Sequence, residues 1–308
     1  TLEGLSFTAG PAQQGVARGI LLDGARGTAI RDVEISETAM PGLHLSASIQ
    51  TTLEAISISE LTSDAGPGES VAALRITDAT SVVGADILID ELASASGVSV
   101  QGLLIGGGAS IALSDVQIQD IGAANAFTLE AASSSAAIVV ESATSVTLAD
   151  ILVEGIYSQS GGGEEQTAFA HGIAMRSCLQ CGLVDAQVIG VIAGDTTHQG
   201  TSTEVGGEAL GVLIEESPNL SLDHVEVREV FAGSGHHGST STGEEQATGG
   251  EANGLRLVDT EGALLHDLKL SRVLGGGNRL ATDTYAPDYH PHGPSHGLRI
   301  VESDDVEA

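Results

Sequence analysis

Aromatic residues are nearly missing from this chain of 308 residues: they make up 2%, and tryptophan is absent. A globular core usually draws much of its buried area from aromatic side chains. A core in this chain therefore has to be built from Val, Ile, Leu and Ala in narrow, uniform layers. No apolar run approaches the ~18 residues of a membrane-spanning helix. The sequence begins without Met and shows no signal peptide, so we expect a mature or excised piece of a longer chain.

Positive charge is also scarce. The chain has 11 basic residues against 42 acidic ones, which gives a formal net charge of −31, and Lys269 is its one lysine. A field of this sign repels nucleic acids and anionic membrane surfaces, so we expect neither as a partner. The same field keeps the surface soluble and attracts cations. Solubility in a saline habitat and a role for divalent cations both remain open.

What the chain does contain is one degenerate repeat along its whole length, which is the first feature to seek in a sequence. The unit reads G-[ILV]-x-[ILV], then a small residue, then [VIL]-x-L-x-D-[VIL]-x-[IV], and it ends in a variable loop. Copies run from Gly42 to Ile58, from Gly102 to Ile118 and from Gly211 to Val227. The apolar residue after the Asp serves as an anchor, and the anchors are Leu5, Val33, Ile56, Ile87, Val116, Ile151, Ala186, Val225 and Leu268.

Small residues recur at two fixed distances before the anchors. One column lies fourteen residues before the anchor and the other lies eight before it; Gly211 and Ser217 are the members for Val225. Apolar residues alternate with period 2 between these positions, which indicates strands. The phase of the alternation breaks twice in each unit. We therefore predict coils of three short strands with two tight bends and one long variable loop, each strand pairing in parallel with its equivalent ~4.8 Å away.

This pattern resembles the right-handed parallel β-helix family, the fold of pectate lyases, polygalacturonases, phage tailspikes and many secreted bacterial surface proteins. The resemblance covers essentially the whole chain and implies an all-β solenoid of about nine coils. We expect residues 1–308 to form a single continuous β-solenoid, a segment of a longer chain or stack. The resemblance is specific for the fold and weak for the function.

The variable loops lengthen toward the C-terminus. Successive anchors are 23 residues apart from Val33 to Ile56 and 43 apart from Val225 to Leu268. Since the strands keep their length, the long loops within residues 157–296 should project from one side of the solenoid, where insertions often form the binding face. These loops hold many His and acidic residues, and we expect stacking to gather a broad set of them: Glu164, Glu165, His171, His198, Glu204, Glu208, His236, His237, Glu244, Glu245 and Glu251.

A metal site is one hypothesis for these loops. Imidazoles with carboxylates suit Zn, Ni or Cu, whereas carboxylates with carbonyls suit Ca. No cofactor is certain, and Ca or a transition metal are the candidates. The alternative is polar, Gly-rich loops that are solvated or pack on a neighbouring chain. The candidate ligands are His236, His237, Asp288, His290, His292 and His296.

Two further sets of residues are predicted to be structural. The Asp before the anchor should cap the bend by accepting hydrogen bonds from backbone N–H groups, as in Asx-turns. Cys178 and Cys181 occupy core positions, where we expect two buried thiols, with a local disulfide as the alternative that implies an oxidising compartment. The capping residues are Asp32, Asp86, Asp115, Asp150, Asp185 and Asp267.

Three functions fit these features. Uniform repeats favour an extracellular or cell-surface structural or adhesive protein, a filament or stalk that self-associates end to end or through its long loops. A polysaccharide-degrading lyase or hydrolase is the alternative, but the N-T-D and R-I-K motifs of polygalacturonases are missing and Asp304-Asp305 follows the His-Gly pairs. A glycan-binding protein without turnover would need exposed aromatics. We assign no catalytic residue and lean against an enzyme; the candidate aromatics are Tyr157, Phe169, Phe231, Tyr285 and Tyr289.

Overall fold

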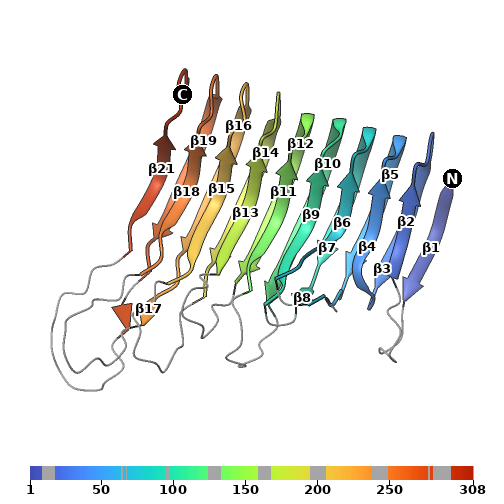
Figure 1. The fold of residues 1–308 in the computed structure, drawn as a ribbon, viewed down its shortest axis with the longest axis horizontal. Helices are drawn as coiled ribbons and strands as arrows, with labels where there is room; N and C mark the ends of the chain where they lie inside the picture. The colour runs from blue at the N-terminus through green and yellow to red at the C-terminus, as the bar shows by residue number, and fades with distance from the viewer. Residues whose placement is uncertain are drawn as a thin grey trace.

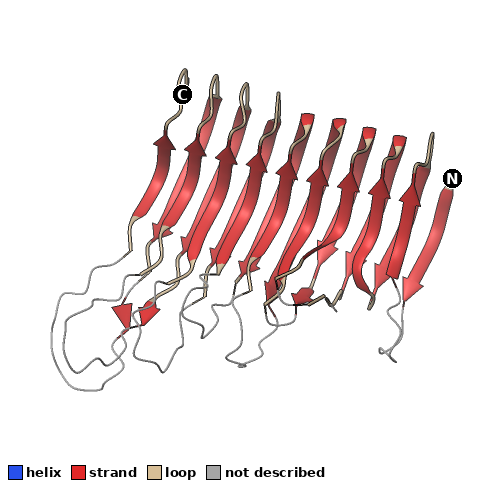
Figure 2. Cartoon of the chain, viewed as in Figure 1, coloured by secondary structure: helices blue, strands red, loops and turns tan. Residues whose placement is uncertain are grey.

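The chain winds into a parallel β-helix in the computed structural model, consistent with the right-handed form (Figure 1). The structure describes residues 1–8, 18–63, 65–66, 68–94, 97–123, 133–158, 168–194, 206–236, 249–276, 278–279 and 293–307. Strands are the regular elements of this part of the chain, as Figure 2 shows. The same residues contain no helix long and apolar enough to span a membrane.

One sheet, here called the long-strand sheet, contains nine strands in parallel succession, and the short β8 (Leu92–Ser94) pairs with one of them, β10. The strands that follow one another are β1 (Leu2–Thr8), β3 (Ala29–Ser36), β5 (Ile49–Ser59), β7 (Thr80–Asp90), β10 (Ala109–Ala123), β12 (Thr144–Tyr157), β14 (Gly182–Ile192), β16 (Ser221–Phe231) and β19 (Leu264–Leu274).

The second sheet, the short-strand sheet, also has nine parallel strands. A separate small sheet pairs β17 (Gly235–His236) with β20 (Asn278–Arg279). The strands of the short-strand sheet are β2 (Arg18–Asp23), β4 (Ala39–Ser46), β6 (Ser70–Thr77), β9 (Ser99–Gly106), β11 (Ser135–Glu141), β13 (Phe169–Arg176), β15 (Glu208–Glu215), β18 (Ala252–Val258) and β21 (Ser295–Val301).

The predicted register is confirmed. Each anchor pairs with the next one along the whole long-strand sheet, from Leu5 with Val33 to Val225 with Leu268. The segments that the sequence predicted to be long loops run from the end of a long strand to the start of the next short strand. Since the strand ends Tyr157, Ile192 and Phe231 are themselves in register, these connections leave from one side of the solenoid.

A coil has two strands and not the three that the phase breaks suggested. In the coil of β15 and β16, residues with left-handed backbone turn the chain at Glu216 (φ 48°), Asn219 (φ 55°), His224 (φ 53°) and Glu229 (φ 62°). The last two lie inside β16, because a single left-handed residue redirects the strand while the pairing with neighbouring coils continues on both sides. The predicted second and third strands are therefore one bent strand.

The Asp column lies at the first bend inside the long strands. Its six Asp residues all have φ between 50° and 54°. Left-handed backbone is costly for most L-residues, and Asp and Asn tolerate it best after Gly. Within the described residues, none of these carboxylates accepts a hydrogen bond from a backbone N–H group. The predicted capping is therefore not what the structure shows, and tolerance of the left-handed backbone accounts for the residue type.

The core fills the space between the two sheets with aliphatic side chains, as expected from the composition. It forms one cluster, from Ile30 to Leu265. The coil of β15 and β16 contributes eight side chains that are at most 2% exposed: Ala209, Val212, Ile214, Leu220, Leu222, Val225, Val227 and Val230.

The first column of small residues faces this core. A Cβ atom added to Gly211 would overlap Cγ1 of Val227 in the opposite sheet and would lie 2.6 Å from the carbonyl oxygen of Gly254 in the next coil. Gly172 meets the same obstruction from Val188. The narrowness of the solenoid at this position therefore explains why the repeat requires small residues there.

The second column of small residues lies at the corner after each short strand, and its members from Ser48 to Thr260 are buried except Gly108. Its hydroxyl members satisfy backbone groups that the corner would leave unpaired. Ser217 Oγ donates to the carbonyl of Glu215 (2.7 Å) and accepts from the N–H of Cys178 in the preceding coil (3.1 Å). Thr260 Oγ1 donates to Val258 in the same way (3.0 Å). These hydrogen bonds join corners of successive coils.

Cys178 and Cys181 form a disulfide across this corner, with their Cα atoms 6.0 Å apart. Both side chains are buried, as their register predicted. The expectation of two free thiols is nevertheless wrong, because the corner between them turns both side chains into the same core layer. A Cα separation near 6 Å is typical of disulfides.

Candidate functional site

The candidate site lies on the outer face of the short-strand sheet, beside the long connections. Phe169 begins β13, Glu208 pairs with it at the start of β15, and Glu251 takes the equivalent place before β18. These three residues lie in one row because each stands three positions before a small residue of the first column. The sequence thus predicted correctly that Glu208 and Glu251 lie close together.

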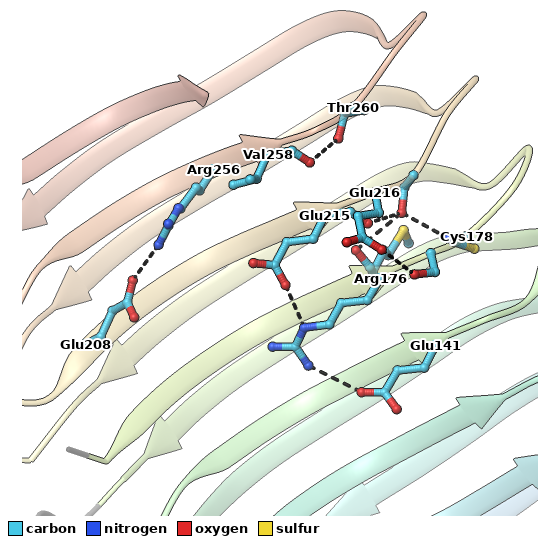
Figure 3. A network of polar contacts seen from close by, with 12 residues as sticks. Glu141, Arg176, Cys178, Glu208, Glu215, Glu216, Arg256, Val258 and Thr260 are labelled. Carbon is cyan, nitrogen blue, oxygen red and sulfur yellow. Dashed lines mark hydrogen bonds and ion pairs between the residues drawn. The ribbon is translucent and has the colours of Figure 1, made fainter. Parts of the chain in front are cut away.

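A second row on this face supplies arginines. Arg256 stands on β18, two residues after Gly254, and Arg299 stands on β21, two residues after Gly297. Each arginine reaches back to the glutamate of the preceding coil. Arg256 Nη1 donates to Glu208 Oε1 at 3.0 Å, as Figure 3 shows, and Arg299 Nη1 donates to Glu251 Oε1. One Glu–Arg pair is therefore repeated in two successive coils.

The two glutamates differ in their protonation behaviour. Burial raises the pKa of Glu208, and the neighbouring Glu251 carboxylate adds to this while Arg256 opposes it. Burial also acts to raise the pKa of Glu251, but hydrogen bonds from Arg299 and Asn253 outweigh it, so that this pKa is lowered. The Asn253 bond is 2.8 Å long, from Nδ2 to Oε1 of Glu251. Adjacent carboxyl groups with opposite pKa shifts are a frequent arrangement for an acid and a base.

An aromatic platform and a buried imidazole adjoin the glutamates. The Phe169 ring is 41% exposed and stacks on His171, with centroids 5.0 Å apart. His171 is buried, and burial is the main cause that lowers its pKa to about 3, with Arg176 and Arg256 acting in the same direction. The imidazole is therefore neutral and rigidly placed beneath the exposed ring.

Among the described residues, Arg75 Nε and Gln101 Oε1 are buried polar atoms on this face without a hydrogen-bond partner, and two more lie beside the glutamates. The two beside the glutamates are Oδ1 of Asn253, on a side chain that is fully buried, and Nε of Arg256. Burying a polar group without a partner costs free energy, on the order of 1–3 kcal/mol. Neither atom is exposed to solvent, so both are internal features of this face and not groups that a ligand can reach.

A ladder of charges borders the site toward the disulfide corner (Figure 3). Arg176 on β13 donates through Nε to Glu215 at 2.9 Å and through Nη1 to Glu141 at 3.3 Å, which links three successive coils. These side chains are about one third to one half exposed. Ion pairs with this exposure contribute little to stability, so their main effect is to fix the orientation of Arg176 at the rim.

Four of the residues predicted as metal ligands lie outside the part of the chain that the structure describes. They are His237, Asp288, His290 and His292. His236 is part of β17, and His296 is an exposed residue of β21 in register with Asn253. The loop metal site therefore stays a prediction.

Three of the candidate aromatics lie in the described residues, and two of them, Tyr157 and Phe231, belong to a stripe whose end members are exposed and whose middle members are half-buried. One row at the ends of four successive long strands holds Tyr157, Ile192, Phe231 and Leu274. Tyr157 is 45% and Leu274 is 57% exposed. Phe169 stands at the site described above, and Tyr285 and Tyr289 lie outside the described residues.

Sequence reasoning missed Asn253, Arg256 and Arg299. A signal for the arginines was available: Glu recurs three residues before the small-residue column in two coils, and Arg recurs two residues after it in the following coil.

Comparison with known proteins adds information on the fold alone. No protein-family model matches this chain, and no curated protein matches it. Among solved structures, the periplasmic alginate epimerase AlgG is 11% identical, with a TM-score of 0.26 over 91% of this chain and 78% of that one. The catalytic domain of a GH87 α-1,3-glucanase is 8% identical, with a TM-score of 0.20 over 96% of this chain and 63% of that one.

The A-module of the Azotobacter vinelandii mannuronan C-5 epimerase AlgE6 is 10% identical, with a TM-score of 0.19 over 99% of this chain and 88% of that one. At such identities and TM-scores, these similarities do not indicate which residues of this chain act or on what.

Proposed function

We propose that the protein hydrolyses a polysaccharide at the Glu208–Glu251 pair. The observation that carries this proposal is the opposite pKa shift of two neighbouring carboxyl groups beside an exposed aromatic ring. Hydrolysis of a glycosidic bond needs one protonated and one ionised carboxyl group on the two sides of the bond. In this proposal Glu208, whose pKa is raised, is the proton donor, and Glu251, whose pKa is lowered, is the ionised partner.

In the proposed reaction, Glu208 donates its proton to the glycosidic oxygen as the bond from that oxygen to the anomeric carbon breaks. Glu251 removes a proton from the water that attacks the anomeric carbon, so that a new hemiacetal and a free hydroxyl group are formed. Phe169 offers an apolar surface for a sugar ring.

The disulfide supports a location outside the cytoplasm, which a polysaccharide substrate requires. Disulfides persist in oxidising compartments such as the periplasm and the extracellular space, and Cys178–Cys181 is one. We therefore propose that the protein works outside the cytoplasm, where polysaccharides of cell walls and matrices are found.

The test is an assay of the whole chain on neutral glucans and on uronate-containing polymers, with release of reducing ends as the readout. Glu208→Gln and Glu251→Gln should each lower kcat/KM by roughly 100-fold or more, the usual contribution of an acid or base. Glu215→Gln is the matched control, because Glu215 lies on the same strand and also pairs with an arginine. Equal activities of the three variants would refute the assignment.

Glycan binding without turnover is a second candidate, and the stripe at the ends of the long strands favours it. Aromatic and aliphatic side chains repeat at each ~4.8 Å step along the solenoid, which suits an extended chain of similar units. Replacement of Tyr157 or Phe231 by Ala should weaken retention in affinity electrophoresis through immobilised polysaccharide. Leu264→Ala is the control, since Leu264 is 52% exposed at the other end of β19. Unchanged retention in all variants would exclude the stripe as a binding surface.

A further inference from the structure

Two successive coils carry the same pair of residues in opposite order. Asp223-His224 stands in β16, and His266-Asp267 stands in β19. The register pairs Asp223 with His266. His224 occupies the left-handed position that belongs to Asp in most coils, and Asp267 occupies it in the next coil. The strands therefore place two imidazoles and two carboxylates in a small square on the outer surface of the long-strand sheet.

The side chains of this square point toward one another. Oδ1 of Asp223 lies 2.6 Å from Nδ1 of His266 and 2.9 Å from Nδ1 of His224. Oδ2 of Asp267 lies 3.5 Å from Nε2 of His224. One ligand atom from each of Asp223, His224 and His266 lies within 4.8 Å of the other two. Three atoms of the types that bind transition metals thus converge.

We propose that Asp223, His224 and His266 bind a transition-metal ion of the zinc type. Two imidazoles and one carboxylate are a usual ligand set for such ions, with bond lengths of about 2.0–2.2 Å. Ligand atoms around a tetrahedral ion are then about 3.3 Å apart, so Oδ1 of Asp223 needs to move away from the two imidazole nitrogens, which lie at 2.6 Å and 2.9 Å. All three side chains are at least one third exposed and have room for this movement.

The surroundings of the square favour a cation. A surface depression of about 230 Å³ opens beside it, and its lining includes Asp185, Glu226 and Asp267, with Lys269 as its one basic residue. The net charge of −31 raises the local concentration of cations over the whole surface. The depression leaves space for the water molecules that would complete the coordination of an ion held by three protein ligands.

This site differs from the one predicted in the loops. It is built from strand residues whose positions the coil register fixes, and it lies on the long-strand sheet, whereas Glu208 and Glu251 belong to the short-strand sheet. The proposal is therefore independent of the proposed hydrolytic function. The competing explanation is that the four residues form ion pairs between coils and bind no metal.

The experiment is a titration of the whole chain with Zn²⁺ by calorimetry and with Co²⁺ by visible absorption. We expect one ion to bind with His224 and His266 as ligands, and His224→Asn and His266→Asn should each weaken this binding at least tenfold. Asn is chosen at position 224 because it tolerates left-handed backbone. Circular dichroism of each variant should match that of the parent chain, which separates loss of a ligand from loss of the fold.

Two controls distinguish this site from the other histidines. His296→Asn changes an exposed histidine on the short-strand sheet, and the double variant His290→Asn/His292→Asn changes the predicted loop ligands. Both should keep the binding of the parent chain. Absence of bound metal in the parent chain, or loss of binding in the loop variant with retention in the two strand variants, would overturn the proposal.

Discussion

The neutral imidazole of His171 should make the stability of the protein depend on pH in a defined window. In the folded protein, burial and two nearby arginines lower its pKa to about 3, whereas a histidine in an unfolded chain has a pKa of about 6.5. Between these values the unfolded chain binds a proton at this position and the folded protein does not. Acid therefore favours the unfolded chain. The contribution of His171 to the free energy of unfolding falls as pH decreases from about 7 toward 3, and it is constant above pH 7.

The size of the effect follows from the difference in bound protons. Each full proton bound only by the unfolded chain lowers the free energy of unfolding by about 1.4 kcal/mol per pH unit. Between pH 6 and pH 5 the unfolded histidine is mostly, but not fully, protonated, and the expected loss is ~1.2 kcal/mol. The side chain is 5% exposed, so screening by solvent reduces this value little.

The assay compares the parent chain with His171→Asn in urea unfolding followed by circular dichroism at pH 7, 6 and 5. The substitution also removes packing, but this loss is the same at each pH and cancels in the difference between pH 6 and pH 5. The parent chain should lose ~1.2 kcal/mol more than the variant over that interval. Equal losses, or an NMR signal of the His171 ring that titrates near pH 6.5, would show that the imidazole is not held neutral.

Three further predictions concern the core, the disulfide and self-association. Gly211→Ala should lower the free energy of unfolding by about 1–3 kcal/mol, the usual cost of overpacking. The control is Gly182→Ala, which should change the free energy of unfolding much less, because an added Cβ would meet only a carbonyl oxygen at 3.8 Å. Equal urea midpoints of the two variants would contradict the steric explanation. Replacing Cys178 and Cys181 together by Ala should cost about 2 kcal/mol from the short loop they close, and dithiothreitol should destabilise the parent chain but not the variant. End-to-end self-association should appear in light scattering as a mass that rises with concentration, and a constant monomer mass would exclude it.

The register of the fold could be read from the sequence because a solenoid repeats each contact in every coil. The anchors and the two columns of small residues were predicted, and both are found; the strand ends from which the connections leave are also in register. Each is a position where the narrow core restricts the residue type, so the restriction recurs along the chain. The number of strands in a coil was not predicted correctly, since a left-handed residue such as His224 bends a strand without interrupting its pairing.

The candidate sites depended on contacts between outward-facing side chains of successive coils. Glu208 and Arg256 are 48 residues apart, and Asp223 and His266 are 43 apart, yet each pair is in hydrogen-bond contact. Outward-facing residues are free to vary because no core packing restricts them, so only the structure shows which of them meet. The sequence by itself therefore determined the solenoid and its register. The tertiary structure decided which side chains converge, which carboxyl group is buried, and that the two cysteines share one core layer.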